Sequence, residues 1–359
     1  MGYGYKKIKL LVITQKIDIN DDVLGFMHDW IKKLAERLKS LDVICLYKGK
    51  YDLPGNVKIY SLGKEKNGNK LKYLWQLYKY AWKLLKMNDL LFVHMNHKYI
   101  ILFWPLAKIL GRPIALFKAH RKKQRFLKIA TLLSDKIISY LKESFPFKSE
   151  KLDVIPPAVN TRDFRELKDL KRNNNEILFV GRISPIKNLE DIIKLALLLN
   201  KEETNFNFKI IGVPSTNRDR RYLESIKKEI EKRDLKEQFK FVGKIPNKKL
   251  AEYYNKAGFF INLCNKTGVD KTLLEAMACD CVPITNQTTI KPFLGQYAND
   301  IFVESVTEAR DKILNLSRDT SKREKLSKEL AQLVRKNHGL DSLIDKLVKV
   351  FEKIIKSKS

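Results

Sequence analysis

The sequence has few cysteines, and their spacing fits neither a disulfide framework nor a zinc site. Four cysteines occur, at Cys45, Cys264, Cys279 and Cys281, and no two have CxxC spacing. We therefore predict reduced thiols in the hydrophobic core. Asp-x-Asp pairs and histidine clusters with metal-ligand spacing are also missing, so no metal site is predicted.

Long apolar runs are missing as well. No stretch of about eighteen uncharged apolar residues occurs, so no membrane-spanning helix is predicted. The N-terminal residues 1–9 lead directly into a predicted strand and do not resemble a signal peptide. We expect a cytoplasmic protein, with peripheral attachment to the inner face of the membrane as a further possibility.

Acidic residues are scarce relative to basic ones. The chain has 71 Lys and Arg against 41 Asp and Glu, a net charge of +30. This excess is more than solubility requires and indicates a polyanionic partner, although a lysine-rich proteome is an alternative explanation. We expect an anionic membrane surface and no nucleic acid, because no known nucleic-acid module is present.

The chain does contain a regular alternation of short apolar runs and amphipathic helical stretches. This alternation predicts parallel sheets covered by helices on both faces, and 359 residues suit two such domains. The polar segment 160–175 is predicted to link the two domains. The predicted strands lie at 8–14, 43–47, 57–62, 90–94, 114–117, 136–140, 152–155, 177–181, 208–212, 239–243, 258–263, 282–285 and 301–303.

Two cations follow a predicted strand near the centre of the chain. The apolar residues 177–180 lead into Gly181 and Arg182, and Lys187 comes five residues later. Ligands of open α/β sheets bind beyond the carboxyl ends of the strands, and both side chains bind phosphate oxygens well. The pattern predicts a diphosphate site, with solvated loop cations as the alternative.

A second strand, 258–263, also runs into a loop and then a helix. Gly268 in this loop can bring backbone amides close to an anion, and the helix beginning near Lys271 would point its positive end at the same place. Glu275, one turn into the helix, can accept hydrogen bonds from a vicinal diol such as a ribose. A solvated helix face is the alternative, although the apolar neighbours of Glu275 indicate that it lies beside buried surface.

These motifs, Gly181-Arg182-x4-Lys187 and Glu275-Ala276-Met277-Ala278, resemble those of the GT-B glycosyltransferases, specifically family 4, the retaining group that uses nucleotide-activated sugars. The resemblance implies that Arg182 and Lys187 hold the donor diphosphate and that Glu275 binds the nucleotide ribose. The family's first acid should stand where this chain has Thr267. We expect Asp270 to take over part of its contact with the transferred sugar, or alternatively to cap the helix.

The first half of the chain resembles the family less closely. The family's glycine-rich turn after the first strand is represented only by Gly25, which we expect near the donor. The run 112–120 resembles the strand that precedes the family's active-site histidine, so the resemblance places His120 near the transferred sugar. His94 and Asn96 follow another predicted strand, and we expect them on the acceptor side or, for His94, in a structural role.

The resemblance implies an α/β fold of two Rossmann-like doubly wound domains that face each other across a cleft. We expect an acceptor-side domain at residues 1–165, a nucleotide-sugar domain at 166–338, and a helix at 339–359 that could pack back on the first domain. The implied activity transfers a sugar from a UDP- or GDP-sugar co-substrate, without metal or other cofactor, to a glycan or lipid-linked acceptor. A degenerate protein that binds nucleotide sugar without transfer is the alternative, and a nucleic-acid-binding protein is a more distant one.

One stretch has the composition of a helix that lies at a membrane surface. Residues 70–87 contain five lysines and no acid, interleaved with Trp75, Tyr78, Tyr80 and Trp82. With the basic run 118–128, it predicts a first domain that rests on anionic lipid. The alternative is a helix whose aromatic side chains pack on the sheet.

Overall fold

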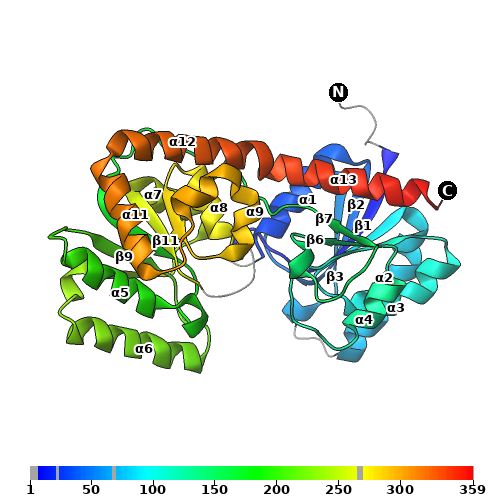
Figure 1. Cartoon of the computed structure of the whole chain (residues 1–359). Helices are drawn as coiled ribbons and strands as arrows, with labels where there is room; N and C mark the ends of the chain where they lie inside the picture. The colour runs from blue at the N-terminus through cyan, green and yellow to red at the C-terminus, as the bar shows by residue number, and fades with distance from the viewer. Residues whose placement is uncertain (1–6, 22–23, 67–69, 265–269, 359) are drawn as a thin grey trace. The chain divides into compact units, whose positions relative to one another are not determined.

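The computed structural model describes residues 7–21, 24–66, 70–264 and 270–358. It divides into two compact units, the first comprising residues 1–156 and 340–359 and the second comprising residues 157–339 (Figure 1). Each unit has its own parallel sheet.

The sheet of the first unit has seven parallel strands in the order β3-β2-β1-β4-β5-β6-β7. Its interior strands β4 and β5 are almost wholly apolar and buried, and so is the first half of β1 from Leu10 to Ile13, as strands covered on both faces must be. The strands span β1 Lys9–Ile17, β2 Ser40–Lys48, β3 Val57–Ser61, β4 Leu90–His94, β5 Ile114–Phe117, β6 Lys136–Ser139 and β7 Leu152–Val154.

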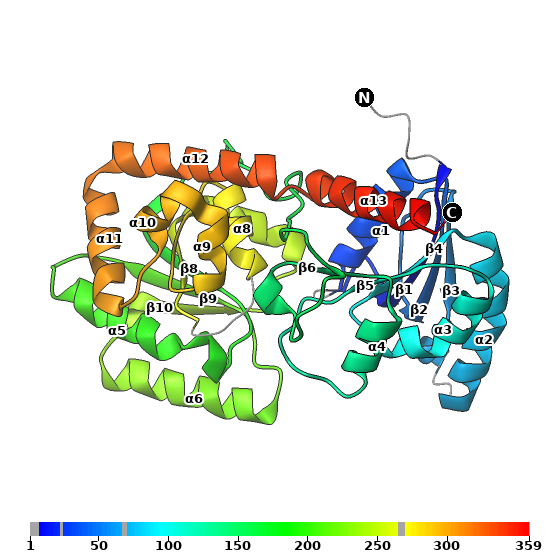
Figure 2. The same ribbon diagram turned by 45° about the vertical axis from the view of Figure 1, so that its right-hand side comes forward.

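Helices cover both faces of this sheet. Apolar residues of α2, α3 and α4 share one core cluster with the strands, and Figure 2 shows these three helices grouped together. The C-terminal helix α13 packs against α1, and Arg37 of α1 forms ion pairs with Asp341 and Asp345 of α13. The helices of this unit are α1 Phe26–Arg37, α2 Lys70–Met87, α3 Lys98–Ile109, α4 Leu127–Leu133 and α13 Leu340–Lys356.

The second unit has a five-stranded parallel sheet in the order β10-β9-β8-β11-β12. Its strands are β8 Asn173–Val180, β9 Asn207–Ile211, β10 Phe239–Gly243, β11 Ala257–Asn262 and β12 Val282–Thr285. Its helices are α5 Leu189–Asn200, α6 Asn217–Lys232, α7 Leu250–Lys256, α8 Lys271–Ala278, α9 Lys291–Leu294, α10 Ala298–Ile301, α11 Val306–Arg318 and α12 Thr320–Asn337. The two sheets confirm the predicted α/β class with two doubly wound domains.

Two local predictions are wrong. The strand expected at 301–303 is reduced to an isolated bridge between Phe302 and Thr285. The segment expected as a linker is packed into the second unit. Phe164 is buried there, and Arg172 donates hydrogen bonds to the backbone carbonyls of Tyr254, Ala257 and Cys279. Most charged side chains of the segment are exposed, but Phe164 and Arg172 attach it to the second unit.

The four cysteines are buried and unpaired, as predicted. Among the described residues, no helix combines the length and the apolar character needed to cross a membrane.

Candidate functional site

Both sheets reverse their strand order at one point, between β1 and β4 in the first unit and between β8 and β11 in the second. Ligands of such sheets bind outside the carboxyl ends of the strands at this switch point. Arg182 and Lys187 follow β8, and Asp270 and Glu275 follow β11. His94 closes β4. The predicted site residues of each unit therefore gather at the edge where the fold favours a ligand.

The loop after β8 is held by a close backbone approach. Gly212, at the end of β9, has φ of 141°, and a Cβ atom there would lie 1.8 Å from the carbonyl oxygen of Gly181. Only glycine permits this contact. Gly181 also faces Lys187, whose Cε would lie 3.4 Å from an added Cβ. The two glycines thus allow the backbones after β8 and β9 to approach each other closely and leave room for the Lys187 side chain.

Lys187 and Asp270 form an ion pair that links the loop after β8 to the start of α8. Asp270 also accepts hydrogen bonds from Asn262 Nδ2 at 3.1 Å and from Thr272 Oγ1 at 2.8 Å, and it caps α8. Burial alone would raise the pKa of Asp270, but the Lys187 charge and these hydrogen bonds lower it. Asp270 is therefore a carboxylate that orients Lys187, and its expected contact with the transferred sugar stays a prediction.

Glu275 is a buried carboxyl group on α8. Its side chain accepts hydrogen bonds from the Tyr254 hydroxyl at 3.1 Å and from Asn247 Nδ2 at 3.4 Å. Burial raises its pKa from 4.5 to about 7, so the group is poised between its neutral and charged forms near neutral pH. A carboxyl group that is kept off bulk water in this way is suited to bind hydroxyl donors of a ligand.

Further cations surround this edge of the second sheet. Burial lowers the pKa of Lys271, one turn before Glu275, to about 8, whereas Arg182 is exposed. Thr267 and Gly268, which were expected beside them, lie outside the described residues. The cations and the beginning of α8 together can neutralise a diphosphate.

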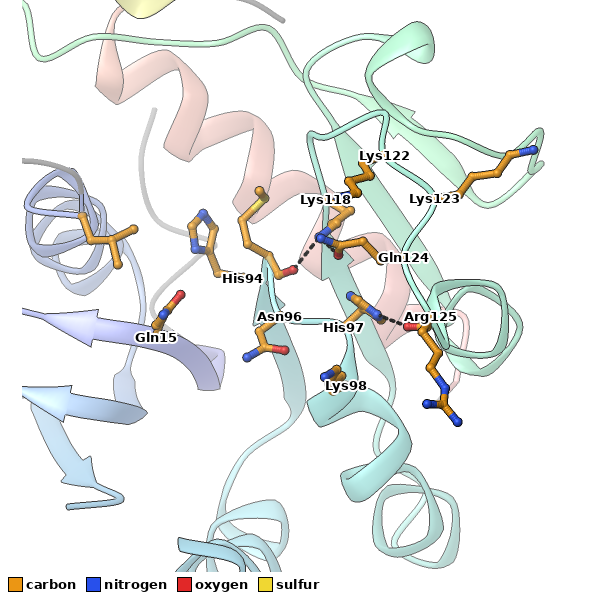
Figure 3. Close-up of a pocket in the computed structure, with 12 residues that line it drawn as sticks. Gln15, His94, Asn96, His97, Lys98, Lys118, Lys122, Lys123, Gln124 and Arg125 are labelled. Carbon is orange, nitrogen blue, oxygen red and sulfur yellow. Dashed lines mark hydrogen bonds between the residues drawn. The ribbon is translucent and has the colours of Figure 1, made fainter. Parts of the chain in front are cut away.

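The first unit carries a pocket of about 640 Å³ at the carboxyl ends of β4 and β5 (Figure 3). No acidic residue is among those that line it, whereas five cations are. The lining residues are Gln15, Leu24, His94, Met95, Asn96, His97, Lys98, Lys118, Lys122, Lys123, Gln124 and Arg125.

Two of the site residues predicted in the first unit line the pocket, and a third is exposed in a loop. His94 and Asn96 both line the pocket, and the His94 ring packs among Phe26, Trp30 and Phe117, in keeping with a structural role. His120 is exposed in the loop after β5, where its Nδ1 accepts a hydrogen bond from the Lys122 amide at 3.0 Å.

Gly25 begins α1, and its amide donates to the Asp21 carbonyl at 2.8 Å. A Cβ atom at this position would lie 2.4 Å from that oxygen. The tight turn therefore accounts for this glycine without a donor ligand, and its expected place near the donor stays a prediction.

Sequence reasoning missed two buried polar residues. Lys118 was assigned to a basic surface, but it is 3% exposed and lines the pocket. Asn262, fully buried at the end of β11, orients Asp270. Both residues lie at the ends of predicted strands, and this position could have identified them as site residues. In the described part of the chain, no three His, Cys, Asp or Glu side chains are grouped so as to hold a metal ion.

Comparison with known proteins shows what the chain resembles. Residues 160–332 match the family model for glycosyl transferases group 1. A 175-residue region is 24% identical to an alpha-monoglucosyldiacylglycerol synthase of Streptococcus pneumoniae, covering 48% of this chain and 38% of that protein. A 134-residue region is 26% identical to the capsular polysaccharide biosynthesis glycosyltransferase CapH of Staphylococcus aureus, covering 37% of this chain and 36% of that one. The aligned regions thus span little more than a third of these relatives.

The fold is shared over a much longer region. The crystal structure of Anabaena HepE in complex with UDP and glucose matches 96% of this chain and 99% of its own, with a TM-score of 0.73 and 14% sequence identity. Most of the second unit therefore matches the model for glycosyl transferases group 1, and the chain as a whole has the GT-B fold.

Proposed function

We propose that this protein is a glycosyltransferase that moves a sugar from a UDP- or GDP-sugar to a glycan or lipid-linked acceptor. The observation that carries the proposal is the arrangement at the carboxyl ends of β8 and β11. There the cation Lys187 is paired with Asp270 at the beginning of α8, and the buried acid Glu275 lies one turn into the same helix. This arrangement offers partners for a diphosphate and for a ribose diol, the two parts common to nucleotide sugars.

Sugar transfer leaves a nucleoside diphosphate, so the growing negative charge must be stabilised. Lys187, Arg182 and Lys271 would stabilise that negative charge as positive groups already in place, without a metal ion. Glu275 would accept hydrogen bonds from the ribose. Backbone amides near Gly268 would contact the diphosphate, and Asp270 or Thr267 would contact the transferred sugar. His120 would hydrogen-bond to the sugar, and retention of configuration rests on the family resemblance alone.

Nucleotide binding is the first test. We expect UDP or GDP to bind the wild-type protein, and Lys187→Met and Glu275→Ala each to weaken this affinity about tenfold or more, because each removes a direct partner. Lys228→Met is the matched control, since Lys228 is exposed on α6 and away from the strand ends. Equal affinities in all four proteins would show that the nucleotide does not bind where we propose.

Turnover is the second test, and it separates the enzyme from a degenerate nucleotide-sugar-binding protein. We expect release of UDP or GDP from a nucleotide sugar to persist in EDTA and to fall in His120→Ala while nucleotide affinity is unchanged. UDP and UDP-glucose are suitable first probes, since the HepE structures contain UDP with glucose and UDP-glucose. Binding without release in the presence of lipid and glycan extracts would favour the degenerate alternative.

We also propose that the first unit attaches peripherally to anionic membranes through α2. Its buried face contributes Leu77, Leu84 and Leu85 to the core, and Tyr80 packs against Tyr60. A neighbouring face exposes a row of large apolar and aromatic side chains with helical spacing, namely Leu71, Leu74, Trp75, Tyr78 and Trp82.

Lysines lie over the exposed indoles of this face. Lys79 Nζ is 5.1 Å from the ring centre of Trp75, and Lys86 Nζ is 4.2 Å from that of Trp82. Exposed aromatics beside cations are typical of helices that lie in the headgroup region of anionic membranes. The sequence had left open whether the aromatics pack inward, and Tyr73 and Tyr80 do so.

Vesicle binding tests the attachment. We expect the protein to bind phosphatidylglycerol vesicles with a blue shift of tryptophan fluorescence, and a Trp75→Ala/Trp82→Ala variant to lose most of this binding. Tyr51→Ala is the control, because Tyr51 is exposed to a similar degree on a different segment. Salt-sensitive binding to RNA but not to vesicles would contradict the proposal.

A further inference from the structure

The pocket of the first unit is a polar cavity with charge of one sign. Lys98, Lys118, Lys122, Lys123 and Arg125 line it, together with the amide side chains of Gln15, Asn96 and Gln124. Among the described residues, no carboxylate lines it to neutralise these cations. A pocket for a neutral sugar would be expected to offer acidic acceptors to the sugar hydroxyls, so this lining favours an anion.

Lys118 is a buried cation in the wall of the pocket. Its side chain is buried, and its ammonium group donates to Met95 O at 3.0 Å and to Gln124 Oε1 at 2.8 Å (Figure 3). An ammonium group has three N–H donors, so these two bonds orient the group and leave a third donor for a ligand. Burial lowers the pKa of Lys118, and an anion bound beside it would restore the charged form.

Hydrogen bonds connect the turn after β4 and the loop after β5, which form the walls of the pocket, without a ligand. Met95, at the turn after β4, has φ of 63°, an uncommon conformation for a residue other than glycine. His97 Nε2 lies 2.9 Å from the Arg125 carbonyl oxygen, which connects this turn to the basic loop after β5. The hydrogen bonds of Lys118 bridge the same two segments. A preorganised site of this kind binds a ligand with little loss of conformational entropy.

We propose that this pocket binds a phosphate group carried by the acceptor, so that the enzyme glycosylates a phosphate-bearing glycan or lipid. The inference rests on the proposed function, because it assigns the pocket to the acceptor. The donor's diphosphate has its own cations on the second unit, at Arg182 and Lys187. A phosphate, with three or four oxygens and up to two charges, uses the cations of the pocket more fully than a single carboxylate does.

Binding of small phosphates tests this inference with the donor site filled. At saturating UDP, sn-glycerol 3-phosphate and inorganic pyrophosphate are titrated against the full chain, with glycerol and glucuronate as the neutral and carboxylate counterparts. We expect the two phosphates to bind, with affinity that falls as salt rises, and glycerol and glucuronate to bind at least tenfold more weakly. Glucuronate or glycerol binding as tightly as the phosphates would overturn the proposal.

Variants locate the binding. Lys122→Glu/Lys123→Glu and Lys118→Gln should each weaken phosphate binding about tenfold or more, whereas Lys39→Glu should not. Lys39 is an exposed lysine at the opposite end of the same sheet. If Lys118→Gln does not fold, the double variant, which changes only exposed side chains, carries the test. Unchanged phosphate affinity in a folded pocket variant would overturn the inference.

Separate measurements keep this inference distinct from the proposed function. UDP affinity should be the same in all of these variants, and its absence in the wild-type protein would count against the proposed function, not against the pocket. With UDP-glucose in place of UDP as the sugar donor, phosphatidylglycerol vesicles offered beside soluble glycerol phosphate then show the source of the phosphate. Transfer to the lipid alone indicates a lipid acceptor, and transfer to soluble phosphates indicates a glycan phosphate.

Discussion

Glu275 should make the stability of the second unit depend on pH. Its pKa is raised by burial from 4.5 to about 7 in the folded chain. Between these two values the folded chain therefore holds a proton that the unfolded chain has released. By linkage, the free energy of unfolding falls as the pH rises through this range. A shift of this size corresponds to at most about 3 kcal/mol of stability lost by pH 7.5.

The variant Glu275→Gln removes the titration and keeps a hydrogen-bond acceptor for the Tyr254 hydroxyl. We expect the variant and the wild type to have similar free energies of unfolding near pH 4.5. At pH 7.5 the variant should be more stable by up to about 3 kcal/mol. Lys271 disturbs this window little, because its pKa of about 8 leaves it mostly charged up to pH 7.5.

Urea unfolding can measure this change in stability, because the two units can be followed by different spectroscopic signals. The four tryptophans, Trp30, Trp75, Trp82 and Trp104, all lie in the first unit, so their fluorescence serves as an internal control. Circular dichroism follows both units and should move with the variant. A stability difference that is the same at pH 4.5 and pH 7.5 would refute the reasoning.

UDP affinity should show the opposite trend. Ribose hydroxyls donate to the carboxylate more strongly than to the neutral acid, so wild-type affinity should increase as the pH rises toward 7. The Glu275→Gln variant should lack this increase. The acid would then destabilise the fold at the same pH at which it binds the ligand best.

Three further substitutions test other parts of the structure. Lys187→Met leaves the partly buried Asp270 without its cation and should lower the free energy of unfolding by about 1–3 kcal/mol, whereas Lys228→Met should not. Gly212→Ala should destabilise the second unit by about 2–4 kcal/mol because its Cβ would clash with Gly181, whereas Gly243→Ala, which has positive φ but open space, should cost only about 1–2 kcal/mol. Arg37→Ala should cost about 1 kcal/mol by tryptophan fluorescence, since its partner Asp341 is half exposed. Because the pKa of Asp341 is lowered, chiefly by its hydrogen bond from Arg37 acting against burial, this difference should be present at neutral pH and disappear in acid.

Much of the fold could be predicted from the alternation of apolar runs and amphipathic stretches. Buried parallel strands are short and apolar, so most of them were found near their true positions. The segment 160–175 was misjudged because composition records polarity and not the partners of each polar group. Arg172 looks like a linker residue in the sequence, yet its guanidinium binds three backbone carbonyls of the second unit.

The candidate site could be predicted only in part. Strand ends are visible in the sequence, so Lys187 and Glu275 could be proposed from position and flanking residues. The pairing of Lys187 with Asp270 could not, because it depends on β8 and β11 being neighbours in the sheet. Asp270 was therefore assigned to the sugar or to the helix cap, whereas the structure shows it capping α8 and also holding the lysine.

Charge alone could not have found either site, because 71 basic residues are spread along the chain. The topology of the sheets distinguishes a few of them. Lys118 and Lys187 each lie beyond the carboxyl end of a strand near a switch point, and each is oriented by oxygen atoms of the protein. An exposed lysine binds anions weakly because it must give up hydration and mobility, whereas an oriented and partly buried lysine has already lost both. The same physical rule therefore underlies both proposals, a donor diphosphate on the second unit and an acceptor phosphate on the first.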